Sequence, residues 1–259
     1  MSTPIEASFT KLLGIMDELR AKCPWDKKQT FESLRHLTIE ETYELSESIQ
    51  QMQADEIKKE LGDLLLHIVF YAKLGDEKGW FNIKDVMESL MEKLIRRHPH
   101  IYGDVVAEDE ATVKKNWEQI KLAEKDSNSQ TKGLLDGVPL GMPSMVKALR
   151  MQEKAAQVGF DWPNKTQVWA KVKEELLEFE QAKSTQNREQ ELGDLFFAMI
   201  NYARFENINP DDALEYTNRK FKKRFEYIEQ QATTAGKSLT ELSLSEMDVW
   251  WNESKTYFK

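Results

Sequence analysis

Apolar side chains recur three and four residues apart along much of the chain. Two clear examples are Phe9, Leu12, Leu13, Met16 and Leu19, and then Leu61, Leu64, Leu65, Ile68 and Val69. This spacing places the apolar residues on one face of an α-helix, and the alternation typical of a half-buried strand is not sustained anywhere. The pattern predicts an all-α protein.

One segment interrupts this periodicity near the middle of the chain. Residues 124–143 (EKDSNSQTKGLLDGVPLGMP) collect Ser, Asn, Gly and Pro, the residues that favour turns and loops. We therefore expect a linker over residues 124–143, between an N-terminal helical module over residues 1–123 and a C-terminal one over residues 144–259.

The two halves share an ordered series of motifs. EETYE at 40–44 corresponds to EELLE at 174–178, ELGDLLL at 60–66 to ELGDLFF at 191–197, KLIRR at 93–97 to KFKKR at 220–224, and Trp117 to Trp251. The offset between matched positions changes only between these motifs, where loops that connect helices would lie. An internal repeat of this kind predicts two tandem repeated helical-bundle modules.

Acidic residues within these motifs have helical spacing. Glu175 with Glu178, and Glu191 with Asp194, lie three apart and so share a helix face. Two such helices packed antiparallel bring four carboxylates together, and their mutual repulsion is relieved by a divalent cation. Oxygen ligands without Cys or His favour Mg²⁺, with Mn²⁺ as a substitute. The corresponding ligands in the N-terminal module are Glu41, Glu44, Glu60 and Asp63.

Acidic runs on helices are often only solvated surface, and for a single EExxE motif that is the expected explanation. The duplication argues against it. So does a glycine in each ExxD motif, Gly62 and Gly193, because Gly inside a helix costs about 1 kcal/mol relative to Ala. Close helix packing, or close approach of a ligand, would explain a missing side chain there.

A di-iron carboxylate bundle is the main alternative for paired Glu on facing helices, but it needs Glu-x-x-His pairs. The chain has none: the residues three before His36, His67, His98 and His100 are Ser33, Leu64, Ile95 and Arg97. We therefore expect all four histidines to be surface or helix-capping residues without a chemical role.

Cations that could bind a triphosphate also lie near these motifs. Lys220 and Arg224 share a helix face, Lys171 lies one turn before Glu175, and Arg188 lies one turn before Glu191. Trp251 could stack on a base, although tryptophans at helical spacing are more often core residues. Lys222 and Lys223 are expected to pair with surface Glu instead.

The composition limits the cellular setting and the partners. The chain has 40% hydrophobic and 31% charged residues, a net charge of −9 and a single cysteine, Cys23. A single cysteine and the lack of an apolar signal predict a reducing cytoplasm, and no run approaches the roughly 18 apolar residues that span a membrane. We expect no nucleic acid polymer as a partner, because binding to its phosphate backbone requires a basic surface.

These motifs resemble the MazG family, nucleoside triphosphate pyrophosphohydrolases of the all-α NTP pyrophosphatase superfamily. The resemblance covers nearly the whole chain, including CPWDKKQT at 23–30, KLIRRHPHIYGD at 93–104 and VGFDWP at 158–163. It implies a homodimer that uses Mg²⁺ to cleave a nucleoside triphosphate to the monophosphate and pyrophosphate. It also implies that Glu175, Glu178, Glu191 and Asp194 bind metal and act in catalysis, with Lys220, Arg224 and Trp251 contacting nucleotide.

Two alternatives stay open at this point. One is a narrower hydrolase for a particular dNTP or for phosphoribosyl-ATP, and the other is a helical adaptor with vestigial metal sites. Within the first interpretation we expect the C-terminal module to be the main catalytic one. Its Lys171, Lys173 and Arg188 correspond to Leu37, Ile39 and Ile57 in the N-terminal module, which has only Lys58 and Lys59 nearby to compensate. The base that deprotonates water is not assigned, since Glu174 points away from Glu175.

Overall fold

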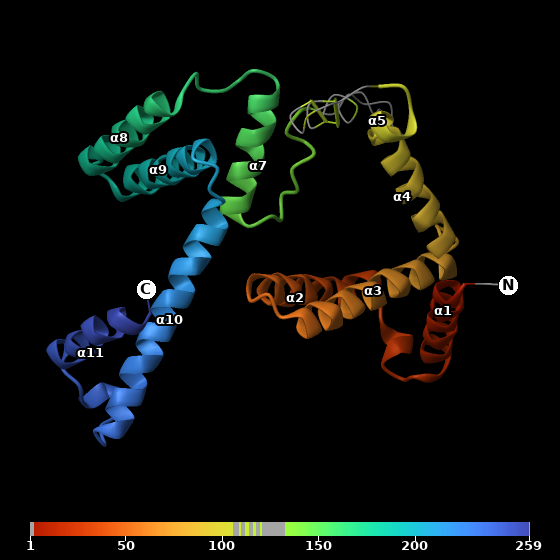
Figure 1. Ribbon diagram of the computed structural model, residues 1–259, viewed down its shortest axis with the longest axis horizontal. Coiled ribbons are helices and arrows are strands. Elements are labelled where there is room, and N and C mark those ends of the chain that lie inside the picture. Colours follow the sequence, from red (N-terminus) through yellow and green to blue (C-terminus); the bar gives the residue numbers. More distant parts are fainter. Residues whose placement is uncertain are drawn as a thin grey trace. The chain divides into compact units, whose positions relative to one another are not determined.

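A computed structural model describes residues 3–105 and 133–258, with a few positions between them: 109, 112–113, 116–117 and 120 (Figure 1). The chain separates into two compact units, Met1–Trp117 and Glu118–Lys259. Every regular element in the described residues is a helix, which confirms the predicted all-α fold. Among these helices, none combines the length and the apolar character that a membrane crossing requires. Of the predicted linker, residues 124–132 lie outside the described part, and residues 133–143 form turns that end directly before a helix.

The first unit is a series of helices joined by short connections. Its elements are α1 (Pro4–Lys22), the 3₁₀ turn η1 (Asp26–Lys28), α2 (Phe31–Gln50), α3 (Ala54–Glu77), α4 (Ile83–Arg97) and α5 (Pro99–Tyr102). Side chains that accept hydrogen bonds from first-turn amides begin three of these helices: Thr3 for α1, Thr30 for α2 and Asn82 for α4. Such caps satisfy amides that have no partner within the helix, and each stabilises its helix by about 1 kcal/mol.

The core of the first unit lies where α1 and α2 meet the second half of α3. Its buried members are Met16, Leu34, Val69, Phe70 and Leu74. Arg20 of α1 ties this region together: it donates to both carboxylate oxygens of Glu77 and to the carbonyls of Asp26 and Gln29. Helices α2 and α3 also pack directly against each other, as an antiparallel pair (Figure 1).

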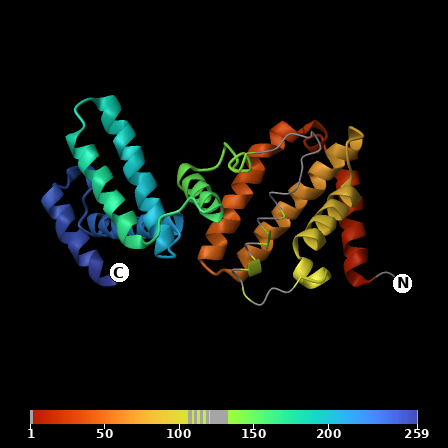
Figure 2. The same ribbon diagram turned by 90° about the horizontal axis from the view of Figure 1, so that it is seen from above.

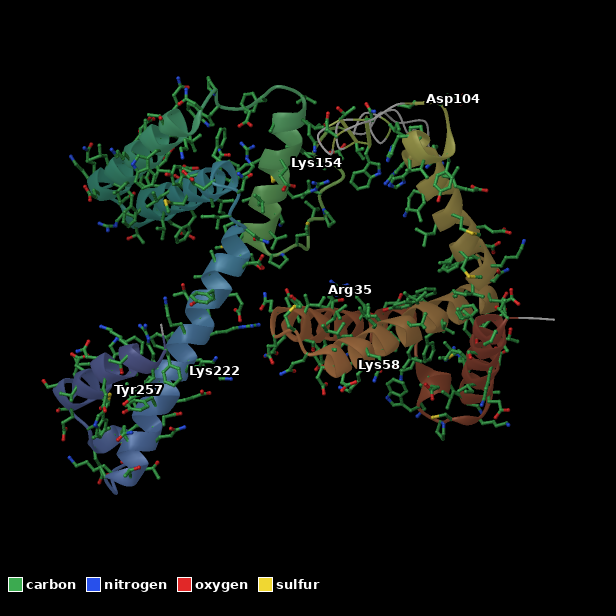
Figure 3. All side chains as sticks on the ribbon, in the orientation of Figure 1. Arg35, Lys58, Asp104, Lys154, Lys222 and Tyr257 are labelled. Carbon is green, nitrogen blue, oxygen red and sulfur yellow. The ribbon has the colours of Figure 1, made fainter. Side chains whose placement is uncertain are left out.

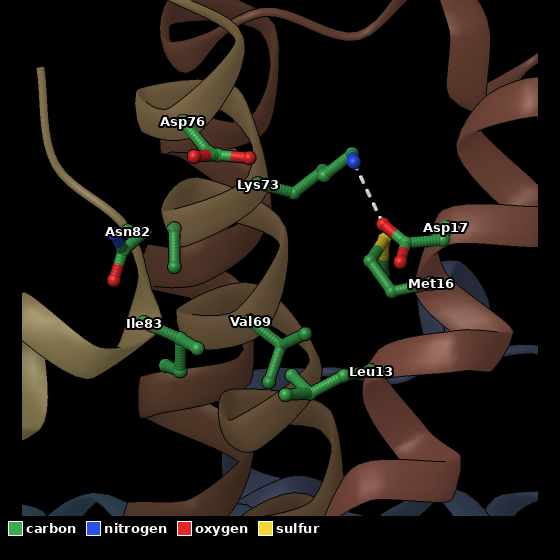
Figure 4. Close-up of a pocket in the computed structure, with 9 residues that line it drawn as sticks. Leu13, Met16, Asp17, Val69, Lys73, Asp76, Asn82 and Ile83 are labelled. Carbon is green, nitrogen blue, oxygen red and sulfur yellow. Dashed lines mark ion pairs between the residues drawn. The ribbon is translucent and has the colours of Figure 1, made fainter. Parts of the chain in front are cut away.

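A pocket of about 180 Å³ lies between α1, α3 and the start of α4 (Figure 4). Apolar side chains such as Leu13, Met16 and Val69 line it together with polar ones, and two of the latter, Lys73 and Asp17, form an ion pair at 2.7 Å. The pocket lies toward the C-terminal end of α3, and its residue Val69 comes six positions after Asp63, less than two helical turns along the helix.

The second unit repeats this arrangement of helices. It contains α7 (Ser144–Gln157), α8 (Lys165–Gln181), α9 (Thr185–Phe205), α10 (Pro210–Thr234), the 3₁₀ turn η2 (Leu239–Glu241) and α11 (Leu244–Tyr257). Helices α8 and α9 form an antiparallel pair, as α2 and α3 do, and α10 pairs with α11 (Figures 1 and 2). The predicted EExxE and ExxD motifs thus fall on equivalent helix pairs in both units.

Candidate metal sites

The first unit brings three of its four predicted acidic residues together. Glu41 of α2 and Glu60 and Asp63 of α3 each offer a carboxylate oxygen, and these oxygens lie within 4.8 Å of one another. The fourth predicted ligand, Glu44, lies outside this group with an exposed side chain. We refer to Glu41, Glu60 and Asp63 as the first cluster.

Glu60 is the most buried member of the first cluster, with 3% of its surface exposed. Its Oε1 accepts a hydrogen bond from Lys59 at 2.9 Å, whereas Oε2 is buried and has no hydrogen-bond partner in the described part of the chain. A buried carboxylate oxygen without a partner loses its hydration and gains nothing in return. Its state indicates that a ligand supplies the missing partner.

The electrostatics of the first cluster point the same way. Burial and the charges of Asp63, Glu44 and Glu60 all raise the pKa of the Glu41 carboxyl above its ordinary value. The metal-free site therefore disfavours full ionisation, and a divalent cation reverses that preference. Three carboxylates with a free buried oxygen fit a hard cation that takes oxygen ligands.

The second unit contains an equivalent group on α8 and α9. Carboxylate oxygens of Glu175, Glu178 and Glu191 lie within 4.8 Å of one another, and we refer to these residues as the second cluster. Asp194 lies outside it and is exposed. Partial desolvation and the charges of Glu175 and Glu191 raise the pKa of Glu178, and the nearby Lys171 opposes this shift.

A lysine binds the most buried glutamate of each cluster, but from a different place. In the second unit Lys171 of α8 lies 2.7 Å from Glu175 and 2.6 Å from Glu174, and these two hydrogen bonds raise its pKa. In the first unit Lys59 of α3 binds Glu60. The two lysines therefore lie on non-equivalent helices: Lys59 follows the first acidic helix of its unit, on α3, whereas Lys171 lies on α8, the first acidic helix of the second unit. The repeat alone does not predict this difference.

The other predicted substrate-binding residues of the second unit lie on α10 and α11. Arg224 donates to the carbonyl of Phe258 at 2.7 Å and lies 5.6 Å from the ring centre of Trp251. Lys220 lies over the ring of Tyr216. In the described residues, no ion pair or hydrogen bond joins these groups to the second cluster, because α10 contacts α7 and α11 more than α9.

The first unit contains an equivalent pair: Arg97, which corresponds to Arg224, lies 5.8 Å from the ring centre of Trp117, which corresponds to Trp251. Arg188 lies 4.9 Å from the ring centre of Phe179, and in the described part of the chain no ion pair joins it to a carboxylate. Lys222, labelled in Figure 3, has an exposed side chain 3.8 Å from Glu226, as expected of a surface cation.

The structure corrects the expectation that all four histidines are surface or capping residues. His98 does cap α4, through a hydrogen bond between Nδ1 and the Leu94 carbonyl, and His36 is exposed. His67, however, is only 7% exposed and lies between α2 and α3. Its position four residues after Asp63, on the same face of α3, is the sequence signal that places it beside the carboxylates.

The structure also decides between the two explanations for the helical glycines. A Cβ built at Gly62 or Gly193 meets nothing within 4 Å in the described residues. Close packing against the described residues of its own unit therefore does not explain either glycine. The open space beside these glycines is accessible to a ligand or to a second subunit.

Comparison with known proteins identifies the family. The sequence profile of the MazG nucleotide pyrophosphohydrolase domain matches residues 29–102, which include the first cluster. The chain is 43% identical to the nucleoside triphosphate pyrophosphohydrolase/pyrophosphatase MazG of Thermotoga maritima, over 95% of each chain. It is 38% identical to the nucleoside triphosphate pyrophosphohydrolase of Escherichia coli K12, over 95% of this chain and 96% of that protein. It is 46% identical to the uncharacterized protein YabN of Bacillus subtilis, over 95% of this chain but 51% of YabN. The chain belongs to the MazG family.

Proposed function

We propose that this protein is a Mg²⁺-dependent nucleoside triphosphate pyrophosphohydrolase, which converts a triphosphate and water to the monophosphate and pyrophosphate. The observation that carries the proposal is the duplicated three-carboxylate cluster, in which Glu60 keeps a buried oxygen without a partner among the described residues. The names of the Thermotoga and Escherichia relatives, which match over nearly the whole chain, support the reaction.

The residues of each cluster suggest how the reaction proceeds. Glu41, Glu60 and Asp63, and in the second unit Glu175, Glu178 and Glu191, hold the cation, with Glu44 and Asp194 available at the edge of each group. Bound Mg²⁺ neutralises phosphate charge and makes a coordinated water more acidic. Water adds to the α-phosphorus, the bond from that phosphorus to the bridging oxygen breaks, and pyrophosphate leaves. Lys171, Lys220 and Arg224 stabilise the charge on the departing oxygens.

Deprotonation of the attacking water requires a general base. Glu174, the acidic neighbour of the second cluster, accepts a short hydrogen bond from Lys171 at 2.6 Å. This hydrogen bond engages the Glu174 carboxylate with Lys171, so Glu174 is better placed to hold Lys171 than to bind a water molecule.

We further propose that the protein is a homodimer. Helix α4 has no buried residue, although Met87, Leu90, Met91 and Leu94 form an apolar stripe along it. Helices α8 and α9 likewise expose Leu177 and other large apolar side chains. A second copy that covers such faces would remove them from water. Sedimentation analysis should give the mass of two chains, and a monomer at micromolar concentration would contradict this.

We place the protein in the cytoplasm, where the free thiol of Cys23 stays reduced. We also propose that the second unit carries most of the activity. Lys171 supplies a cation beside the second cluster, and the equivalent position of the first unit is Leu37. In the metal-free protein this lysine binds Glu175, so the cation must replace it there before Lys171 can reach a phosphate.

The experiment is an incubation with a panel of NTPs and dNTPs in Mg²⁺, followed by separation of the products. We expect a monophosphate and pyrophosphate, with Glu178→Ala and Asp194→Ala inactive but fully helical by circular dichroism. Orthophosphate with a diphosphate would contradict the reaction. Turnover of a single nucleotide would indicate the narrower hydrolase, and metal binding without any turnover would indicate an interaction module.

Matched double variants identify the active unit. Glu41→Gln with Glu44→Gln disables the first unit, and Glu175→Gln with Glu178→Gln disables the second. We expect the second pair to lose more turnover at saturating Mg²⁺. A greater loss from the first pair would show that the first unit is the main catalytic one.

A further inference from the structure

A polar layer lies directly beside the first cluster, in the seam between α2 and α3. The Thr38 hydroxyl oxygen is 2.9 Å from Nδ1 of His67 and 2.7 Å from the Tyr71 hydroxyl. Thr38 lies three residues before Glu41, and His67 lies four after Asp63, so this layer is one helical turn from the carboxylates. A histidine buried to this degree next to a group of carboxylates is not a surface residue.

The hydrogen-bond network assigns the proton of the His67 ring. Thr38 Oγ1 also donates to the carbonyl of Leu34 at 3.1 Å, and a carbonyl can only accept. The single hydroxyl proton of Thr38 is then used, and its two lone pairs are left for His67 and Tyr71. Both of these groups must donate, so His67 carries its proton on Nδ1.

The second ring nitrogen, Nε2, then has a free lone pair when the ring is neutral. Burial lowers the pKa of His67, and the charge of Asp63 opposes this only in part. The ring is thus neutral near pH 7. The charge of Asp63, a member of the first cluster, raises the pKa of His67, so the ring lies close enough to the cluster to interact with it electrostatically.

We propose that His67 is a positioning residue of the first cluster: Thr38 holds it as the Nδ1–H tautomer, and Nε2 accepts a hydrogen bond from water beside Asp63. In this role His67 orders the surroundings of a bound cation without touching the nucleotide. The inference rests on the proposed function, because it takes the first cluster to be a cation site. Partners of this kind orient metal ligands and strengthen metal binding.

The second unit lacks this layer. When the repeats are aligned on Gly62 and Gly193, Ala198 takes the place of His67, and alignment on Glu41 and Glu175 puts Val172 in the place of Thr38. Both Val172 and Ala198 are buried and apolar. The two cation sites of one chain therefore differ in the layer below the carboxylates, and the second serves as an internal reference.

The first test needs no metal. The full chain labelled with ¹⁵N-histidine contains four histidines, and comparison with His67→Gln identifies the signals of His67. A two-bond ¹H–¹⁵N correlation spectrum near pH 7 should show His67 as the neutral Nδ1–H tautomer, and Thr38→Val should remove that preference. A ring protonated on Nε2, or on both nitrogens, would overturn the inference.

The second test measures Mn²⁺ affinity at the first cluster, by electron paramagnetic resonance of free Mn²⁺. The parent carries Glu175→Gln and Glu178→Gln, which silence the second cluster. Thr38→Val and His67→Phe in this parent should weaken Mn²⁺ binding about 10- to 100-fold. Tyr71→Phe is the matched control, because it removes a hydroxyl from the same network but leaves the bond between His67 and Thr38.

The outcomes separate this inference from the proposed function. Unchanged Mn²⁺ affinity in both Thr38→Val and His67→Phe would overturn the role of His67 while the cation site stands. A parent that binds no Mn²⁺ would overturn both the inference and the first cation site. Equal weakening by Tyr71→Phe would show that general packing of the seam, and not the imidazole acceptor, supports the site, and would also overturn the inference. Thermal melts by circular dichroism confirm that each variant is folded.

Discussion

Replacing Glu41 with Gln should make the protein more stable than wild type when no metal is bound. At saturating Mg²⁺ the same variant should be less stable than wild type. The change keeps the size of the side chain and removes one negative charge from the first cluster. In the metal-free state that charge faces Asp63 and Glu60 in a partly desolvated seam, where burial and these neighbours raise the pKa of Glu41. With Mg²⁺ bound, the same charge is an attractive ligand.

The magnitude follows from the geometry of the cluster. Two unit charges at 4.8 Å, the upper limit for the separation of these carboxylate oxygens, repel by about 1 kcal/mol in a medium as polar as water and by about 3.5 kcal/mol at an effective dielectric constant of about 20. Protonation limits the repulsion, since protonating a carboxyl with the ordinary pKa of 4.5 at about pH 7 requires about 3.4 kcal/mol. A gain of about 2 kcal/mol lies between these limits, and it corresponds to about 4–8 °C in melting temperature for a protein of this size.

The gain should also depend on pH in a defined direction. A carboxyl whose pKa is raised in the folded state binds more protons there than in the unfolded chain, so stability falls as the pH rises above the ordinary value of 4.5. Glu41→Gln removes this loss. The difference between the variant and the wild type in EDTA should therefore grow from pH 4.5 towards neutral pH.

The assay is thermal unfolding by circular dichroism, in EDTA and in Mg²⁺, with Glu40→Gln as the matched control. Glu40 is adjacent in sequence but exposed, and it has the smallest effect of the charges that raise the pKa of Glu41. We expect Glu40→Gln to melt close to wild type. Glu41→Gln melting below wild type in EDTA would refute the electrostatic account of the cluster, and an equal gain in both conditions would refute the cation site.

Three further predictions test other parts of the structure. Gly75→Ala should destabilise the first unit by roughly 1–3 kcal/mol, because its Cβ would lie 2.7 Å from the Phe81 ring, and chemical denaturation measures this. Gly193→Ala should stabilise the metal-free chain by about 1 kcal/mol yet lower turnover, and unchanged turnover would show that no ligand uses that space. Lys237 and the cap at Ser243 lower the pKa of Glu246 to about 2, so the stability that Glu246 contributes is present above pH 4.5 and is lost towards pH 2. The melting difference between wild type and Glu246→Gln should accordingly shrink across that range.

The sequence predicted those parts of the site that depend on one helix or on two helices joined by a short turn. Glu175 and Glu178 share a face because of helical geometry alone, and the short connection to α9 brings Glu191 to them. The repeat then transferred the same arrangement to α2 and α3. Periodicity was a sufficient guide because the physical cause is local.

Features that depend on packing between elements could not be predicted in this way. Asp194 shares a face of α9 with Glu191, yet its side chain is exposed and lies outside the second cluster. Lys220 and Arg224 lie on a helix whose contacts are mainly with α7 and α11, and no periodicity specifies those partners. The burial of His67 likewise depends on which face of α3 meets α2, and no short metal-binding motif specifies that face.

Helix α10 has a mechanical consequence for the second unit. It contains 25 residues from Pro210 to Thr234, and at 1.5 Å per residue it is a rod of about 37 Å that starts beside α7. Arg224 lies about 21 Å along this rod, so a tilt of only about 10° at its base swings that guanidinium through almost 4 Å. A small change of angle where α7, α9 and α10 meet would therefore move the Arg224 guanidinium by more than the length of a hydrogen bond.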